Sequence, residues 1–288
     1  MKVARTAAEL ERKPRAVAIG TFDGVHTGHR RVLRAAVDAG LDSTVVTFDP
    51  HPRVALGYEV DMLSSLERRL ELIAEEGIDS ALVVEFTLEV ARIEPEDFAR
   101  DVLAAIGTEV VVAGESFRFG HGRSGDVELL RSLGFEVRPV PLVEGVSSTH
   151  VRGLVRSGEV ERAAALLGRP AEVEGVVVAG DARGGTLGFP TANLAVDPRL
   201  VVPAYGIYAG FGHGTRAAVS IGTNPHYGGE ERRVEAFLLD FEGDLYGERL
   251  VLELWRRLRD ERAFESEREL VEQIARDVEE TRAAQRPA

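Results

Sequence analysis

Two histidines stand three residues apart, where an expected strand gives way to an expected helix. His26 and His29 follow the apolar run 16–19, which is typical of a buried strand, and precede residues 30–39, whose apolar positions share one helical face. The N–H groups and partial positive charge of a helix N-terminus attract anions, and imidazoles there can donate hydrogen bonds to phosphate oxygens. The pair therefore predicts phosphate binding. Two alternatives stay open: a metal site, which would need a third ligand, or no chemical role.

A glycine-rich stretch in the second half also suits phosphate chemistry. Residues 180–193 have the sequence G-D-A-R-G-G-T-L-G-F-P-T-A-N, whose glycines allow the backbone to approach a ligand closely. Thr191 and Asn193 offer oxygens suited to a hard cation such as Mg²⁺, which favours phosphate partners. The alternative is a long glycine-rich hairpin between two strands. Neither stretch is the phosphate loop that ends in Gly-Lys-Ser/Thr, because that tripeptide does not occur in the sequence.

A third polar cluster, Ser147, Ser148 and Thr149, comes just before another expected helix, which carries Arg152 one turn later. Ser and Thr commonly cap helices, so the cluster could be a helix cap. It could also be a second phosphate site, formed by backbone N–H groups, hydroxyls and the Arg152 guanidinium. The two roles are compatible, and we favour the phosphate site.

The elements that must position these residues alternate between strands and helices as far as residue 167. This alternation predicts right-handed βαβ units and a parallel, Rossmann-like sheet. Ligands of such sheets lie at the carboxyl ends of the strands, where the polar clusters of the first half occur. The expected strands are residues 16–20, 43–48, 80–86, 109–113 and 135–140, and the expected helices are residues 30–39, 65–76, 95–106, 126–133 and 160–167.

The apolar pattern changes to a period of two after Gly168, where the last of these helices is expected to end. Consecutive strands without helices predict an antiparallel sheet, in the form of a closed β-barrel. We therefore place two domains at residues 1–168 and 169–288. A terminal helix is expected from about Ser266, which has capping-box spacing to Glu269, and the tail after residue 281 is expected to fray. The expected strands are residues 172–179, 205–211, 216–221, 233–241 and 249–255.

The composition is that of a soluble globular protein and narrows the classes of function. The chain has 288 residues, which suits two domains of about 150 residues each. Its formal net charge is −13, so nucleic acid is not expected as a partner, because such binding usually needs a basic face. The chain has no cysteine, which excludes disulfides, thiol nucleophiles and iron–sulfur clusters. We see neither a secretory signal nor an apolar run of membrane-spanning length, so we expect a cytoplasmic protein with no membrane partner.

Along nearly its whole length the chain resembles the prokaryotic bifunctional riboflavin kinase/FAD synthetases. The first half has, in order, the motifs G-T-F-D-G-V-H-T-G-H, T-F-D-P-H-P, G-E-S-F-R-F-G and S-S-T-H-V-R. The second half has the glycine-rich motif that ends in P-T-A-N, followed by G-I-Y, V-E-A-F-L-L-D and D-L-Y-G. The paired-histidine motif is shared with many nucleotidylyltransferases. The P-T-A-N motif within its glycine-rich stretch is far more specific to this family. The resemblance implies an N-terminal nucleotidylyltransferase domain and a C-terminal riboflavin kinase barrel.

For the first domain the resemblance implies adenylyl transfer, in which FMN and ATP give FAD and pyrophosphate. It implies catalytic roles for His26, His29 and Arg152. Each phenylalanine among the flavin candidates could instead be a core residue. The residues implied in ATP binding are Gly20, Phe22, Asp23, Gly24, Gly28, Ser147, Ser148 and Thr149, and those implied in flavin binding are Phe48, Ser116, Phe117 and Phe119.

For the second domain the resemblance implies phosphoryl transfer from ATP to the 5′-hydroxyl of riboflavin, giving FMN and ADP. It implies that Glu235 is the general base and that Thr191 and Asn193 hold Mg²⁺ against the ATP phosphates. The alternation of apolar residues around Glu235 leaves its facing open, so a solvated strand glutamate is the alternative. The residues implied in ATP binding here are Gly180, Arg183, Gly188 and Pro190.

Three positions depart from the family's usual residues: Ser116 stands for Asp or Asn, and His150 and Gly185 each stand for Arg. None of these removes a residue that we consider indispensable.

Two other classes of function stay open. One is an enzyme with a single working module, which assays of each half alone would identify. The other is a non-catalytic flavin or nucleotide sensor, whose mark would be loss of His29 or Glu235, and both are present. We expect a monomer or a weak homo-oligomer.

Overall fold

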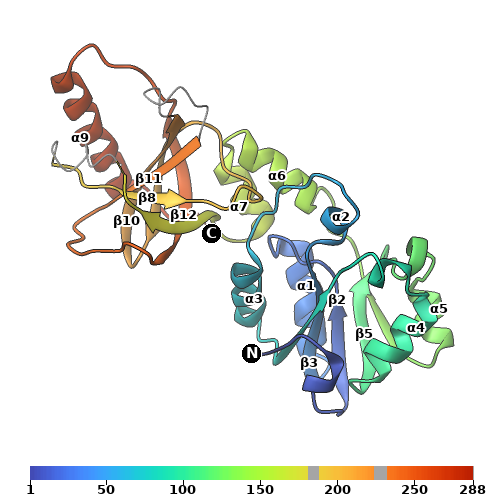
Figure 1. The fold of residues 1–288 in the computed structure, drawn as a ribbon. Helices are drawn as coiled ribbons and strands as arrows, with labels where there is room; N and C mark the ends of the chain where they lie inside the picture. Colours follow the sequence, from blue (N-terminus) through green and yellow to red (C-terminus); the bar gives the residue numbers. More distant parts are fainter. Residues whose placement is uncertain (181–187, 224–231, 288) are drawn as a thin grey trace. The chain divides into compact units, whose positions relative to one another are not determined.

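A computed structural model of the chain describes residues 1–180, 188–223 and 232–287 (Figure 1). These residues form two compact units. The first comprises Met1–Val60 and Ser65–Ser147, and the second comprises Asp61–Ser64 and Ser148–Ala288. Each unit is built around one sheet and has its own apolar core.

The first unit contains a six-stranded parallel sheet in the order β1-β4-β3-β2-β5-β6, which confirms the predicted Rossmann-like architecture. Strands β2 to β6 correspond to the five expected strands. The edge strand β1 was not expected, because three residues are too few to show a period. The strands are β1 Lys2–Ala4, β2 Arg15–Ile19, β3 Asp42–Asp49, β4 Ser80–Glu85, β5 Thr108–Gly114 and β6 Glu136–Val140.

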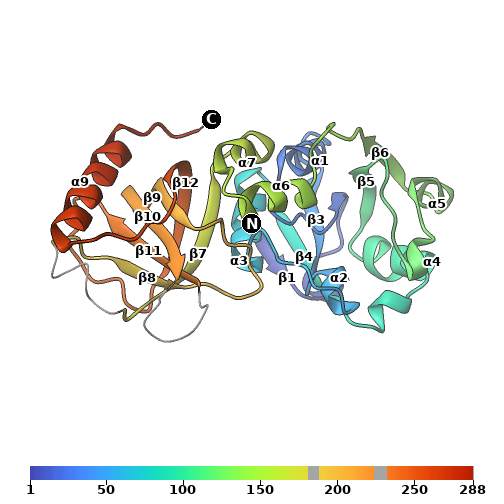
Figure 2. The same cartoon turned by 90° about the horizontal axis from the view of Figure 1, so that it is seen from above.

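Helices cover both faces of this sheet (Figure 2). Successive residues of β2 alternate between two apolar clusters: Ala16 and Ala18 pack with α1 and α3, whereas Val17 and Ile19 pack with α4, η3 and α5. Burial on both faces explains why these parallel strands are continuous apolar runs. The helices are α1 Thr27–Val37, α2 Pro52–Ala55, α3 Leu66–Glu75, α4 Pro95–Phe98 and α5 Val127–Ser132, with the 3-10 turns η1 Ala7–Glu9, η2 Val90–Arg92 and η4 His121–Arg123 and the π-helical segment η3 Ala99–Ala104.

The second unit contains a closed barrel in the order β10-β11-β8-β7-β12-β9, as predicted, and its neighbouring strands are antiparallel. Alternate residues of β10, namely Ala217, Val219 and Ile221, point into the core. Strand β8 was not expected as a strand, because it begins inside the glycine-rich stretch 180–193. The strands are β7 Ala171–Val178, β8 Ala192–Ala195, β9 Gly206–Gly212, β10 Thr215–Thr223, β11 Arg232–Leu238 and β12 Arg249–Arg259.

Two helices precede the barrel in sequence and share its core. They are α6 Ser148–Arg156 and α7 Val160–Leu167. Helix α7 ends at Gly168, which has the left-handed conformation (φ 69°) that glycine adopts readily at a helix C-terminus. Buried apolar residues of both helices belong to the same cluster as the barrel interior.

The terminal helix α9, Glu267–Ala283, begins as predicted at its cap, Ser266, whose Oγ accepts from the Glu269 N–H at 3.3 Å. The expected fraying after residue 281 is wrong. The helix continues to Ala283, and Ala284 is buried at 6% exposure. The Arg216 guanidinium holds this end, because it donates to the carbonyl oxygens of Thr281 at 2.9 Å and Ala284 at 2.6 Å.

Candidate functional site

The paired histidines lie at the N-terminus of α1, directly after the loop that follows β2. His26 caps the helix, and its Nδ1 accepts from the His29 backbone N–H at 3.3 Å. The two imidazoles stack with ring centroids 3.6 Å apart and planes 14° apart. A Cβ on Gly28 would lie 3.2 Å from the His26 ring, so glycine makes room for this stack. Because Nδ1 of His26 accepts, a neutral His26 carries its proton on Nε2.

The loop before the histidines has an unusual backbone. Phe22 (φ 50°), Gly24 (φ 75°) and Val25 (φ 39°) all have left-handed conformations, which are costly for bulky and β-branched residues. The side chain of Asp23, between them, is fully buried. The Phe22 and His29 rings pack in a T-shaped arrangement, with centroids 5.2 Å apart. Strained backbone of this kind is typical of functional sites, where the surroundings hold it in place.

The surroundings of His29 favour the neutral imidazole. Burial, reinforced by the charges of His26 and Arg69, holds the pKa of His29 well below its ordinary value of 6.5. Its Nδ1 is buried and has no hydrogen-bond partner among the residues that the structure describes. His29 is therefore a neutral group with an unused polar atom at a helix N-terminus.

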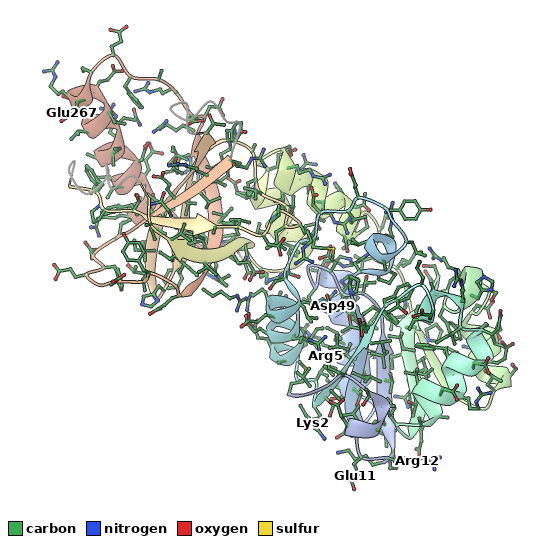
Figure 3. All side chains as sticks on the ribbon, in the orientation of Figure 1. Lys2, Arg5, Glu11, Arg12, Asp49 and Glu267 are labelled. Atoms are coloured by element: carbon green, nitrogen blue, oxygen red, sulfur yellow. The ribbon has the colours of Figure 1, made fainter. Side chains whose placement is uncertain are left out.

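Arg69 of α3 reaches the same edge of the sheet, although no sequence motif predicts a role for it. Its side chain is buried at 2% exposure, and it donates to the carbonyl oxygens of Thr21 at 2.9 Å and Phe48 at 3.1 Å. Asp49, which is labelled in Figure 3, ends β3. Its Oδ1 lies 4.0 Å from Nη2 of Arg69. A signal was available: Arg69 occupies the apolar face of its helix, three residues before Leu72.

The three phenylalanines proposed for flavin binding lie in one apolar cluster of the first unit. Phe119 is 8% exposed, whereas Phe48 and Phe117 are only partly buried. The rings of Phe117 and Phe119 stack 5.6 Å apart, and Phe48 packs edge-on against Phe86 at 5.6 Å. Ser116 is exposed two residues after β5 ends. Their contact with a flavin stays a prediction, and Phe48 and Phe117 are the rings that retain surface.

The third polar cluster is divided between the two units. Ser147 ends the first unit, whereas Ser148 and Thr149 begin α6 in the second. Arg152, one turn later, is buried at 8% exposure, and its guanidinium lies 3.5 Å from Thr149 Oγ1. The role of these residues in phosphate binding stays a prediction.

In the barrel the structure brings together the three residues predicted for phosphoryl transfer. Glu235 of β11 pairs in register with Asn193 of β8, and Thr191 Oγ1 donates to Glu235 Oε2 at 3.4 Å. Val234 and Ala236 on either side point into the core, so Glu235 lies on the outer face of the barrel. This settles the facing that the sequence left open.

Glycine and proline residues lie next to Thr191, Asn193 and Glu235 in the chain or in space. A Cβ on Gly180 would lie 2.2 Å from the Asn193 side chain, so any other residue at position 180 would displace Asn193. Gly188 (φ 86°) and Pro190 are exposed just before Thr191. Arg183 and Gly185 lie outside the described residues.

The metal alternative for the paired histidines gains no support. Within residues 1–180, 188–223 and 232–287, no cluster of three His, Cys, Asp or Glu side chains has a metal-binding arrangement. In the same ranges no helix is both long and apolar enough to cross a bilayer.

Comparison with known proteins matches each half of the chain to a protein family. The family model described as FAD synthetase matches residues 8–151, and the model described as riboflavin kinase matches residues 167–285. Several relatives carry the name bifunctional riboflavin kinase/FMN adenylyltransferase, among them the following two. The protein of Listeria monocytogenes is 35% identical over 286 residues, covering 93% of this chain and 91% of the relative. That of Escherichia coli K12 is 36% identical over 300 residues, covering 96% of both.

A solved structure extends the agreement to the fold. A crystal structure from Streptococcus pneumoniae, described as a macrolide-efflux protein, has a TM-score of 0.86 and 32% identity, covering 97% of this chain and 98% of that one. The two family models occur in the order that the motifs predicted. The chain therefore belongs to the family of bifunctional riboflavin kinase/FMN adenylyltransferases, with the adenylyltransferase first and the kinase second.

Proposed function

We propose that His26 and His29 bind the ATP phosphates during adenylyl transfer to FMN. The stacked imidazoles at the start of α1 carry this proposal, because they add side-chain N–H groups to a helix N-terminus. The attacking FMN phosphate has a second pKa of about 6, so it is an anion near neutral pH and needs no general base. What the reaction needs is alignment and stabilisation of charge on the triphosphate. Arg152 is our candidate for a further cation toward that charge.

We infer that Glu235 is the general base of the kinase reaction. The riboflavin hydroxyl is neutral, so transfer of its proton to a carboxylate assists attack on the ATP γ-phosphorus. The position of Glu235 beside Thr191 and Asn193, on the outer face of the barrel, supports this role.

The same three residues suit Mg²⁺. Thr191 and Asn193 supply a hydroxyl and an amide oxygen beside a carboxylate, and magnesium prefers oxygen donors. Thr191 and Asn193 would hold the ion, which when bound neutralises charge on the ATP phosphates. The remaining ATP contacts of this module would come from Gly180, Arg183, Gly188 and Pro190.

We propose that the adenylyltransferase module spans residues 1–168 and the kinase module spans residues 169–288. The substrates and products are then riboflavin, FMN, FAD, ATP, ADP and pyrophosphate. The limits of the two family models support this division. Phe48, Ser116, Phe117 and Phe119 are proposed for flavin binding in the first module. A cytoplasmic location, and a monomer or weak homo-oligomer, complete the proposal.

A time course of products tests the two-site proposal. Wild-type protein with riboflavin, ATP and Mg²⁺ is expected to make FMN first and FAD second. The His29→Ala variant should accumulate FMN and make no FAD, because the histidines lie in one unit and the kinase residues in the other. Equal loss of both products in a folded His29→Ala variant would contradict the assignment of the two sites.

A further inference from the structure

Arg69 is a buried cation on a helix face that is otherwise apolar. It shares the inner face of α3 with Leu72 and Ile73, both of which are buried. A guanidinium stays charged in proteins, and burying a charge is costly unless it is paired and hydrogen-bonded. A residue of this kind in a core needs a reason beyond packing.

The contacts of Arg69 all lie where β2 and β3 end. Its two terminal nitrogens donate to the carbonyl oxygens of Thr21 and Phe48, which belong to neighbouring parallel strands or the residues just after them. The charges of Asp23 and Asp49 act on it and offset part of the cost of burial. Arg69 thus joins the carboxyl ends of two strands and faces two acidic side chains.

A restraint on the Thr21 carbonyl affects the loop that carries the histidines. Thr21 lies in the loop between β2 and α1, residues 20–26, which we call the histidine loop. It directly precedes the left-handed residues of this loop, Phe22 and Val25 among them. Strained backbone persists only where its surroundings over-determine it. Thr21 has two such restraints from different elements, since its oxygen also accepts from Thr47 Oγ1 at 3.2 Å.

A short chain of contacts links this restraint to the imidazole. Phe22 follows Thr21, and its ring packs against the His29 ring in a T-shaped arrangement, with centroids 5.2 Å apart. Phe22 is also confined from behind, because a Cβ on Gly20 would lie 3.2 Å from the Phe22 ring. A shift of the Thr21 carbonyl would therefore move Phe22 and, with it, the surface against which His29 rests.

We propose that Arg69 is a positioning residue for adenylyl transfer: by joining the Thr21 and Phe48 carbonyls, it holds the histidine loop, and through Phe22 the His29 ring, in reactive alignment. The proposal rests on the role proposed above for His29. Arg69 acts on the alignment of the transition state rather than on substrate binding, so its loss lowers kcat more than it raises KM.

The test compares steady-state FAD formation from FMN and ATP in full-length variants. Arg69→Met should lower kcat by about 10- to 100-fold and leave KM for ATP within about threefold. Arg69→Lys should recover part of this loss, because an ammonium group can donate to the same carbonyls. The matched control is Arg68→Met on the same helix, since the Arg68 guanidinium pairs with Glu71 and Glu75 of that helix at 2.9 and 3.3 Å. Arg68→Met should keep the wild-type kcat.

Two internal checks separate this proposal from its premise. Riboflavin phosphorylation by the same preparations should be unchanged, because Thr191, Asn193 and Glu235 lie in the other unit. His29→Ala is run alongside. If it is inactive and Arg69→Met has a wild-type kcat, the Arg69 proposal alone is overturned. If His29→Ala makes FAD normally, the role of His29 is overturned whatever the Arg69 variants do.

A spectroscopic measurement decides the case in which Arg69→Met does not fold. The imidazole resonances of His29 are recorded by NMR in the wild type and in Arg69→Lys, and are assigned by their loss in His29→Gln. A lowered kcat together with a shifted His29 resonance in Arg69→Lys supports the proposal. A His29 resonance at its wild-type position, with kcat either lowered or normal, overturns it, because Arg69 would then not act through His29.

Discussion

His29 is held neutral by its surroundings, and this couples the first unit to pH. Its pKa in the folded protein lies well below 6.5, mainly because the ring is buried. As the pH falls below 6.5, the His29 imidazole becomes protonated in the unfolded chain but stays neutral in the folded chain, so the free energy of unfolding decreases. The free energy of unfolding is therefore not reduced by His29 above pH 6.5, and it falls progressively as the pH drops from 6.5 toward the pKa of His29 in the folded protein.

We predict that this pH dependence is weaker in His29→Gln. Between pH 7.5 and 5.5 the free energy of unfolding of the first unit should fall by up to about 1.4 kcal/mol less in the variant than in the wild type. The measurement is hydrogen–deuterium exchange of the β2 and β3 amides in the full-length protein at the two pH values. An identical pH dependence in the two proteins would show that His29 titrates normally.

For the barrel, we predict that Glu235→Gln lowers FMN formation while conversion of supplied FMN to FAD persists. General bases contribute about 100- to 10,000-fold to rate, and the amide keeps the size of the side chain while removing its basicity. Rates of FMN and FAD formation are measured on the same preparation. Glu242→Gln, an exposed glutamate between β11 and β12, serves as the control. A loss of less than about fivefold in Glu235→Gln would mean that it is not the base.

The sequence predicted the site residues unevenly, for a physical reason. The histidines, Thr191 and Asn193 could be found because their side-chain chemistry and local spacing stand out. Arg69 could not be recognised in the same way, because its importance depends on carbonyl groups far away in sequence. Beside Arg68 it resembles ordinary surface charge, and only its place on the apolar face of α3 distinguishes it.

At the level of elements, periodicity predicted every long strand and failed where tertiary contacts decide. β1 and β8 are three and four residues long, and each is defined by its neighbours in the sheet rather than by its own pattern. The helix expected over residues 95–106 begins at Pro95 but continues in π-helical form from Ala99. The sequence predicts fraying of the tail after Thr281, yet Arg216 of β10 donates to the carbonyl oxygens of Thr281 and Ala284 and holds this end.

Helix α9 is held to the barrel largely by charged contacts. Arg259 of β12 binds the Asp277 carboxylate with three hydrogen bonds of 2.7 to 3.2 Å, and Asp277 is 4% exposed. Gln273 donates to the same carboxylate at 2.8 Å. The apolar cluster beside the helix is small and is built around Trp255. Removing one partner of a buried pair leaves an uncompensated charge, which is strongly destabilising.

We predict that Arg259→Met lowers the free energy of unfolding of the second unit by about 3 kcal/mol. Urea unfolding followed by the fluorescence of Trp255, the single tryptophan, measures the effect. The matched control is Arg282→Met, which breaks the exposed pair between α9 and Asp240 and should cost much less. Equal effects of the two substitutions would contradict a special role for the buried pair.

At the scale of the whole molecule, the family models and the packing divide the chain at different places. The S-S-T-H-V-R motif, residues 147–152, is one of the motifs that resemble the adenylyltransferase half of the family, and it lies largely on α6. The apolar side of α6 and α7 nevertheless packs into the barrel core. The change of period at Gly168 marks where the strands begin, but it does not show which core the preceding helices join. The buried residues that these helices give to the barrel core are Val151, Leu154, Val155, Val160, Ala163 and Leu167.

We predict that the position of a cut decides whether the barrel folds well alone. A fragment of residues 148–288 keeps both helices, whereas a fragment of residues 169–288 loses their apolar side chains. Burial of one Val or Leu is worth roughly 1.5–3 kcal/mol, so the shorter fragment should unfold at a clearly lower urea concentration. Trp255 fluorescence reports the unfolding of both fragments. Riboflavin phosphorylation should survive in the longer one, because Thr191, Asn193 and Glu235 remain in an intact barrel.

The complementary fragments give the same comparison from the other side. Residues 1–147 form the whole of the first sheet, while residues 1–168 add α6 and α7 without the barrel that covers their apolar side. The longer fragment should therefore bind a hydrophobic dye such as ANS more strongly than the shorter one. Equal dye binding by these two fragments, or equal urea midpoints for the two barrel fragments, would show that α6 and α7 contribute nothing to the barrel core. In that case the boundary of folding would coincide with the boundary at Gly168 that the change of period predicts.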